Sequence, residues 1–219
     1  MYAVDADVWV LTETHDSLGP GSDYAAVHAS QRPFGSDGVV EGSRWVSIWS
    51  RHGFVEAEIA VGDRERTVAC IVDFEGRRLV IYGTVLPWTN DSERDGMEAE
   101  LSRQAPEWLS LPTEHDASFC LAGDFNVNLG GPHYYGSNAS KEAVATRLRD
   151  ADLVAMTDFE RTKDRRPDYG IIDHIALSSD LAPSATLVDL WGPRTEDGRP
   201  MSDHSGVCIE ISRAARVGE

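Results

Sequence analysis

The feature that most constrains the fold of this chain is a series of short segments that are rich in Val, Ile, Phe and Trp and bounded by Gly, Asp or Asn. Segments of this length and composition are typical of β-strands. Arg77 and Arg78, which follow Glu75 and Gly76, predict a hairpin turn between two of them. We expect strands at residues 8–11, 45–49, 54–61, 67–74, 78–86, 118–122, 171–178, 187–190 and 206–211.

Two other stretches have the apolar spacing of a helix. Asp91 and Ser92 can cap a helix that passes through Met97 and reaches about residue 109, and a second helix is expected from Ser140 to about residue 150. Many strands with few, interspersed helices predict an α/β or α+β sandwich. Because no repeat or linker-like stretch divides the chain, residues 1–219 are expected to form a single domain.

The formal charge of −17 disfavours one class of partner. A surface this acidic repels phosphate polymers, so broad electrostatic binding to nucleic acid is not expected. The charge does not exclude a phosphate-containing substrate that is held through a metal ion.

The cysteines and the apolar runs bear on where the protein resides. Cys70, Cys120 and Cys208 each lie inside an apolar run, and their spacing fits no zinc pattern. Buried reduced thiols are typical of a cytosolic protein. No basic segment followed by an apolar one occurs at the start, so no leader peptide is expected, and no apolar run approaches the roughly 18 residues of a membrane helix. We therefore expect a cytoplasmic protein with no membrane partner.

Acidic side chains collect at the ends of the predicted strands. Glu13 follows the first strand, Asp124 and Asn126 follow the sixth, and Asp203 and His204 directly precede the last. Sheets of α/β proteins place their ligands at the carboxyl ends of strands. We therefore expect these groups to share one site.

Asp173 is a further candidate because it interrupts an apolar run, where a carboxylate is costly unless it is paired. His204 is the expected partner. Carboxylates, an amide and an imidazole that converge on one place suit a hard divalent ion, and we expect Mg²⁺ or Mn²⁺.

Four motifs together resemble a known family. Residues 6–13 (ADVWVLTE), 123–127 (GDFNV), 172–175 (IDHI) and 202–204 (SDH) occur in the order found in the endonuclease/exonuclease/phosphatase superfamily, the deoxyribonuclease-I-like group. The resemblance implies a four-layer α/β sandwich of two packed, mainly antiparallel or mixed sheets flanked by helices. It also implies one metal-dependent site at an edge of the sandwich.

The resemblance assigns a role to each residue of the expected site. Glu13 matches a metal-binding glutamate, and Asp203 matches a second acid close to the metal. Asp124 matches the aspartate that orients or deprotonates the attacking water, and Asn126 matches the asparagine that helps to hold the water and the phosphate.

His204 matches the histidine that hydrogen-bonds a phosphoryl oxygen, and Asp173 matches the aspartate that orients this histidine. These roles agree with what phosphoester hydrolysis requires, which is mainly positioning and neutralisation of charge. A carboxylate beside His204 is expected to raise the pKa of the imidazole.

Two departures from the family pattern stand out. Family members begin with a strand that carries an asparagine and is followed by a helix, whereas only residues 1–4 precede Asp5. The domain is therefore expected to be N-terminally shortened, with a native start upstream of Met1 as the alternative. The sheet edge left uncovered invites a homodimer. Val85 occupies the position where the family has a Tyr or His that contacts phosphate, and Thr84 and Tyr82 point to the opposite face of the strand.

Other residues near the expected site have less specific assignments. Trp88, Asn128 and His133 are candidate substrate-binding residues, with Tyr134 as an alternative to His133. His174 is expected to be a buried structural histidine, since neighbouring residues of a strand face opposite sides.

These features predict a metal-dependent phosphoesterase that acts on phosphodiesters, in the manner of a phosphodiesterase or nuclease on nucleic acid or nucleotides. The alternative is a catalytically weak or inactive scaffold of the same fold that binds a partner or a phosphorylated ligand.

Overall fold

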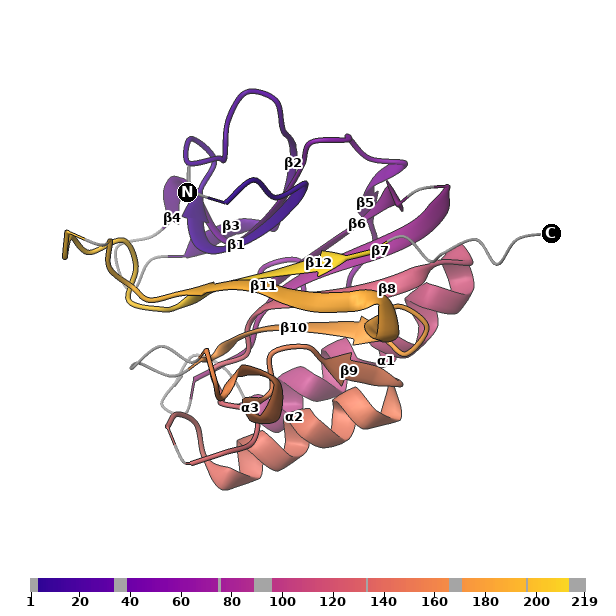
Figure 1. Cartoon of the computed structure of the whole chain (residues 1–219). Helices are drawn as coiled ribbons and strands as arrows, with labels where there is room; N and C mark the ends of the chain where they lie inside the picture. Colours follow the sequence, from indigo (N-terminus) through magenta and orange to yellow (C-terminus); the bar gives the residue numbers. More distant parts are fainter. Residues whose placement is uncertain are drawn as a thin grey trace.

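The computed structural model describes residues 4–33, 39–74, 76–88, 96–132, 134–165, 171–195 and 197–212. Two β-sheets pack face to face, and helices cover the outer face of the larger sheet (Figure 1). The predicted α/β sandwich of packed sheets is thereby confirmed, and the described residues supply three of the four layers that the resemblance implies.

The smaller sheet is organised around one long strand. β4 (Val39–Ser50) pairs antiparallel with β1 (Val8–His15) on one side. On its other side it pairs antiparallel with β2 (Ala25–His28) and β3 (Gln31–Pro33). The sequence predicted only the C-terminal part of β4, residues 45–49, and neither β2 nor β3.

The larger sheet has six strands in the order β5-β6-β7-β8-β10-β9. Only the β7–β8 pair is parallel, so the sheet is mixed. The strands are β5 (Glu56–Ile59), β6 (Thr67–Phe74), β7 (Arg77–Val85), β8 (Ser118–Asp124), β9 (Leu153–Ala155) and β10 (Asp173–Ser178).

The central strands of this sheet are buried on both faces, which explains their nearly continuous apolar sequences. Side chains alternate along β7, so that Val80 and Tyr82 pack against the helices while Ile81 and Val85 pack against the smaller sheet. A Cβ on Gly83 would lie 2.8 Å from Val46 Cγ2, so glycine permits the close approach of β7 to β4.

The two long helices lie side by side on one face of the larger sheet (Figure 1). α1 (Met97–His115) buries an apolar face that includes Leu101 and Trp108, and it runs past the predicted end despite two internal prolines. Its N-cap is Gly96, which makes no side-chain capping bond. The predicted cap at residues 91–92 lies outside the described residues.

α2 (Asn138–Asp150) begins two residues before the predicted Ser140, because the Ser137 side chain accepts a hydrogen bond from the Ser140 amide and caps the helix. The helical segments α3 (Phe159–Thr162) and Ala182–Ser184 are short. No helix in the described ranges is both long and apolar enough to cross a lipid bilayer.

A separate ribbon of β11 (Ala185–Trp191) and β12 (Gly206–Ile211) packs against the same face of the larger sheet as the smaller sheet does. Among the described residues, β1 pairs only with β4 and β12 only with β11, so each keeps one edge without a strand partner. No feature of the described part of the chain supports the homodimer that we expected from such an edge, and it stays a prediction.

The structure agrees in part with the prediction of buried, reduced cysteines. All three are free, and Cys70 and Cys120 are buried between the sheets. Cys208 on β12 is only partly buried.

Candidate active site

Asp124 is positioned by the way β8 ends against β7. Gly123 has a φ of 138°, and a Cβ there would lie 2.0 Å from the backbone oxygen of Thr84. Only glycine fits at this point. The next residue, Asp124, is 2% exposed, and its backbone oxygen accepts a hydrogen bond from the Leu86 amide at 2.8 Å. The carboxylate is therefore placed at the carboxyl end of a rigid central strand.

Asn126 holds the carboxylate of Asp124 from two sides. Its backbone amide donates to Asp124 Oδ1 at 2.8 Å, and its Nδ2 donates to Asp124 Oδ2 at 2.9 Å and to the Leu86 carbonyl at 2.8 Å. Asn126 adopts a left-handed φ of 52°, which asparagine tolerates better than most residues. The sequence predicted that these two residues act together, and the geometry brings them together.

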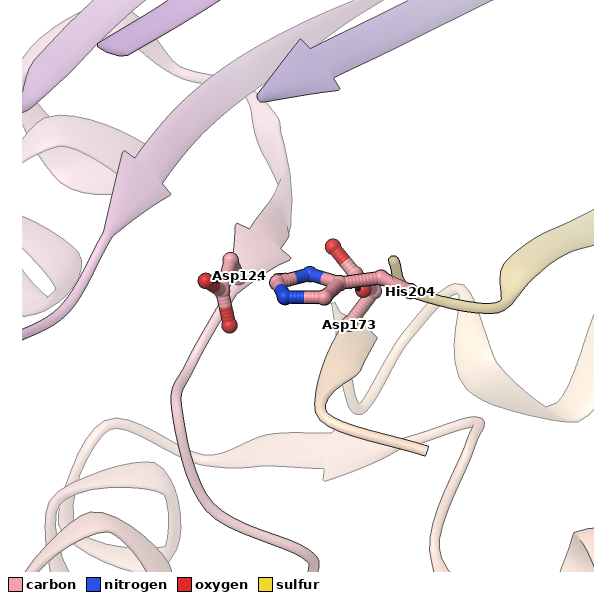
Figure 2. Close-up of side chains that lie close together, drawn as sticks. All are labelled: Asp124, Asp173 and His204. Carbon is pink, nitrogen blue, oxygen red and sulfur yellow. Dashed lines mark ion pairs between the residues drawn. The ribbon is translucent and has the colours of Figure 1, made fainter. Parts of the chain in front are cut away.

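Asp173 and His204 complete the cluster (Figure 2). Asp173 begins β10 and lies directly opposite Asp124 in the antiparallel register. His204 reaches in from the loop before β12, and its Nδ1 lies 3.2 Å from Asp173 Oδ2 and 3.9 Å from Asp124 Oδ2. Its backbone amide donates to Ser202 Oγ at 3.1 Å, which orders this short loop.

Burial and the charges of this cluster together raise the pKa values of both His204 and Asp124. Contact with the Asp173 carboxylate, which outweighs partial burial, raises the pKa of His204 to about 9. Burial, followed by the Asp173 charge, raises the pKa of Asp124, and the His204 charge partly offsets this. The shift of His204 favours a protonated ring beside the Asp173 carboxylate, whereas the shift of Asp124 favours its neutral carboxyl form.

Asp173 Oδ2 is buried and makes no hydrogen bond of good geometry, so its contact with His204 is a close ion pair. Among the described residues, one group could hold a metal ion: Asp124, Asp173 and His204, whose ligand atoms lie within 4.8 Å of one another.

The two residues predicted to bind metal lie at the margin of this group. Glu13, near the end of β1, has a φ of 47°, and its charge contributes to the raised pKa of Asp124. Asp203 is 87% exposed in its side chain, and its Oδ2 lies 3.8 Å from His204 Nε2. Three carboxylates therefore lie near the His204 imidazole, and Glu13 acts electrostatically on Asp124.

The predicted substrate-binding residues differ in their placement. Asn128 is buried, and among the described residues its amide group bonds to the backbone of the following loop. The Trp88 ring lies 6.0 Å from that of Trp45 and 5.5 Å from the guanidinium carbon of Arg66, so it is part of a packed stack. His133 lies outside the described residues.

The structural predictions for neighbouring side chains are confirmed. His174 is buried, with Nδ1 2.8 Å from Thr157 Oγ1 and Nε2 2.9 Å from the Val127 carbonyl oxygen. The Thr84 hydroxyl donates to Gln104 Oε1 on α1, on the side away from Val85.

Sequence reasoning missed two residues of this region. Gly123 is part of the motif at residues 123–127, but the need for glycine there arises because β7 lies so close to β8. Tyr135 gave no signal beyond its place in a glycine-rich loop. Burial raises the pKa of Tyr135, and the charges of Asp124 and Asp203 add to the effect.

Comparisons with known proteins identify the fold. No family model and no curated protein of similar sequence matches the chain. The 3′ phosphatase NExo from Neisseria, solved with a product DNA hairpin, has a TM-score of 0.66 and 19% identity, covering 94% of this chain and 89% of that one. An endonuclease from Archaeoglobus fulgidus has a TM-score of 0.61 and 15% identity, with coverage of 94% and 89%.

An endonuclease/exonuclease/phosphatase protein from Beutenbergia cavernae is also similar, with a TM-score of 0.57, 20% identity and coverage of 93% of this chain and 61% of that one. The chain thus has the deoxyribonuclease-I-like α/β fold.

Proposed function

We propose that this chain, which shares the fold of the endonuclease/exonuclease/phosphatase proteins, is a divalent-metal-dependent phosphoesterase that hydrolyses phosphodiesters. The observation that carries the proposal is the convergence of Asp124, Asp173 and His204 from two strands and a loop, with His204 Nδ1 3.2 Å and 3.9 Å from the two carboxylates. We propose that residues 1–219 act as one domain.

The donor groups fit a hard dication. Three carboxylates lie near one imidazole, Glu13 acts electrostatically on Asp124, and the buried Asp173 Oδ2 pairs with His204 Nδ1 at 3.2 Å. Mg²⁺ and Mn²⁺ prefer such oxygen ligands. We propose that Glu13 and Asp203 hold the ion, which when bound would neutralise charge on the phosphoryl oxygens.

Asp124 is the candidate general base. Asn126 fixes both of its oxygens, and burial raises the pKa of its carboxyl group, which makes the carboxylate a stronger base for a water proton. A carboxylate held in one orientation can also align that water for in-line attack on phosphorus.

His204 is the candidate donor to a phosphoryl oxygen. Its Nδ1 faces Asp173, which leaves the Nε2–H available, and its raised pKa keeps the ring protonated at neutral pH. A cationic donor stabilises the charge that develops on the phosphoryl oxygens. In this proposal Asp173 positions His204 and keeps it charged.

The net charge of the chain bears on whether the substrate is a small phosphodiester or a polymer. A net charge of −17 favours small or locally bound phosphodiesters, although nucleic acid stays a candidate substrate. The cytoplasmic location of the protein itself, expected from the reduced cysteines, stays a prediction.

The central test is hydrolysis of bis(p-nitrophenyl) phosphate with Mg²⁺ or Mn²⁺ and with chelator. We expect metal-dependent hydrolysis that falls at least about 100-fold in Asp124→Asn. Asp150→Asn, an exposed carboxylate at the end of α2, is the matched control and should keep full activity. Equal, negligible rates with and without metal, and no loss in Asp124→Asn, would favour the inactive scaffold.

A second experiment locates the ion. Calorimetric titration with Mn²⁺ should show weaker binding for Glu13→Gln than for Asp173→Asn. If Asp173→Asn weakens binding as much or more, the ion instead lies among Asp124, Asp173 and His204.

A further inference from the structure

One buried side chain organises the loop that follows Asn126. Asn128 Oδ1 accepts hydrogen bonds from the amides of Tyr134 at 3.0 Å and Tyr135 at 2.9 Å. Its Nδ2 donates to the carbonyls of Gly130 at 2.9 Å and Pro132 at 3.0 Å. Asn128 is 4% exposed, so this amide ties both limbs of the loop to the body of the protein.

The returning limb of the loop packs directly against the active-site strand end. Gly136 has a φ of 75°, and a Cβ there would lie 2.9 Å from the Asn126 backbone oxygen and 2.6 Å from Val127 Cγ1. The residue before it, Tyr135, is therefore held next to Asn126. The charges of Asp124 and Asp203 also act on the Tyr135 phenol, raising its pKa, so the ring lies within electrostatic reach of the catalytic cluster.

Both tyrosine rings are nevertheless exposed to solvent, Tyr134 by 44% and Tyr135 by 38%. Single exposed apolar side chains are common on protein surfaces and need no function. This pair differs because a buried amide fixes the backbone of both tyrosines, and Tyr135 lies within electrostatic reach of the carboxylate cluster. Such rings offer flat π-faces that can stack on a planar group.

Charge explains why stacking would serve this site. Around His204 the nearby ionisable groups are carboxylates, and the whole chain carries a charge of −17, so phosphate contacts outside the centre cannot supply much affinity. Stacking on an aromatic base does not depend on positive charge, and it contributes to binding of nucleotides in many proteins.

We propose that Tyr134 and Tyr135 form a stacking subsite for a nucleobase joined to the scissile phosphate, so that the substrates are base-bearing phosphodiesters. This deepens the proposed function and rests on it. Tyr134 and Tyr135 contact the substrate, while Asn128 positions them.

The test compares two substrates that differ only in their bases. One is the dithymidine phosphodiester, and the other is the same dimer with abasic tetrahydrofuran residues in both positions. We expect the protein to prefer the base-bearing dimer in kcat/KM by about 10-fold or more. The variants Tyr134→Ala, Tyr135→Ala and the double variant should lose this preference, while the corresponding Phe variants keep it.

Val188→Ala, an exposed apolar residue on β11, is the control and should keep both rates. Calorimetric binding of the dithymidine dimer to Asp124→Asn, with and without the Tyr→Ala changes, gives a readout that is independent of turnover. Circular dichroism and thermal melting confirm that the variants fold.

The outcomes separate the two proposals. If the protein hydrolyses both dimers and the Tyr→Ala variants change neither the rate ratio nor binding, the subsite is refuted while the phosphodiesterase stands. Equal loss on both dimers also refutes it, because the loop would then act on the centre itself. If neither dimer is hydrolysed but binding of the dithymidine dimer still depends on the tyrosine rings, the subsite stands and the proposed activity falls.

Discussion

His204→Gln is predicted to lower the stability of the metal-free protein in a way that depends on pH. The pKa of His204 is raised from 6.5 to about 9, mainly by the Asp173 carboxylate. A histidine whose pKa is higher in the folded state binds its proton more tightly there than in the unfolded chain. The stability it contributes is therefore fully present below pH 6.5 and is lost as the pH rises through about 9.

The magnitude follows from the same values. The difference between 6.5 and about 9 corresponds to at most about 3 kcal/mol of unfolding free energy, at 1.36 kcal/mol for each pH unit. Because the His204 side chain is 23% exposed, water weakens its interaction with Asp173. We therefore expect the difference in unfolding free energy between wild type and His204→Gln to shrink by about 1–3 kcal/mol between pH 6 and pH 10.

Urea unfolding in the presence of chelator, at pH 6, 7, 8, 9 and 10, measures this gap. His52→Gln is a matched control, since this histidine also faces an aspartate, Asp7, at 3.1 Å but is 61% exposed. The difference in unfolding free energy between wild type and His52→Gln should stay small at every pH. If the difference in unfolding free energy between wild type and His204→Gln is the same at pH 6 and pH 10, the inference that Asp173 holds His204 protonated is refuted.

The remaining predictions concern the strand end, the amide that holds Asp124 and the response to salt. Gly123→Ala should lower stability by about 3 kcal/mol or more in thermal melting, since its Cβ would lie 2.0 Å from the Thr84 oxygen, whereas Gly192→Ala, with open space around it and no positive φ, should cost far less. Asn126→Ala should reduce kcat about 100-fold and leave the Mn²⁺ affinity measured by calorimetry little changed. If kcat and Mn²⁺ affinity fall together, Asn126 does more than hold Asp124. Added salt should hardly alter hydrolysis of a small diester, and a steep fall on single-stranded DNA would instead indicate polymer contacts.

The sequence by itself determined the strand-rich character of the chain and the residue types of the site. Its apolar segments match the buried strands β6, β7 and β8 closely, because a strand buried on both faces needs an apolar run that short-range composition reveals. It also marked Asp173, since a carboxylate inside such a run has to find a partner. The short strands β2, β3 and β9 carried too few residues to be recognised.

Only the tertiary structure decided which of these groups meet. Asp124 and Asp173 are 49 positions apart, and they face each other because the register of β8 and β10 aligns them. The same holds for Asn128, a predicted substrate-binding residue, whose side chain holds the backbone of the loop that carries Tyr134 and Tyr135. Register and loop closure depend on contacts between segments that are distant along the chain, so no local pattern of residues specifies them.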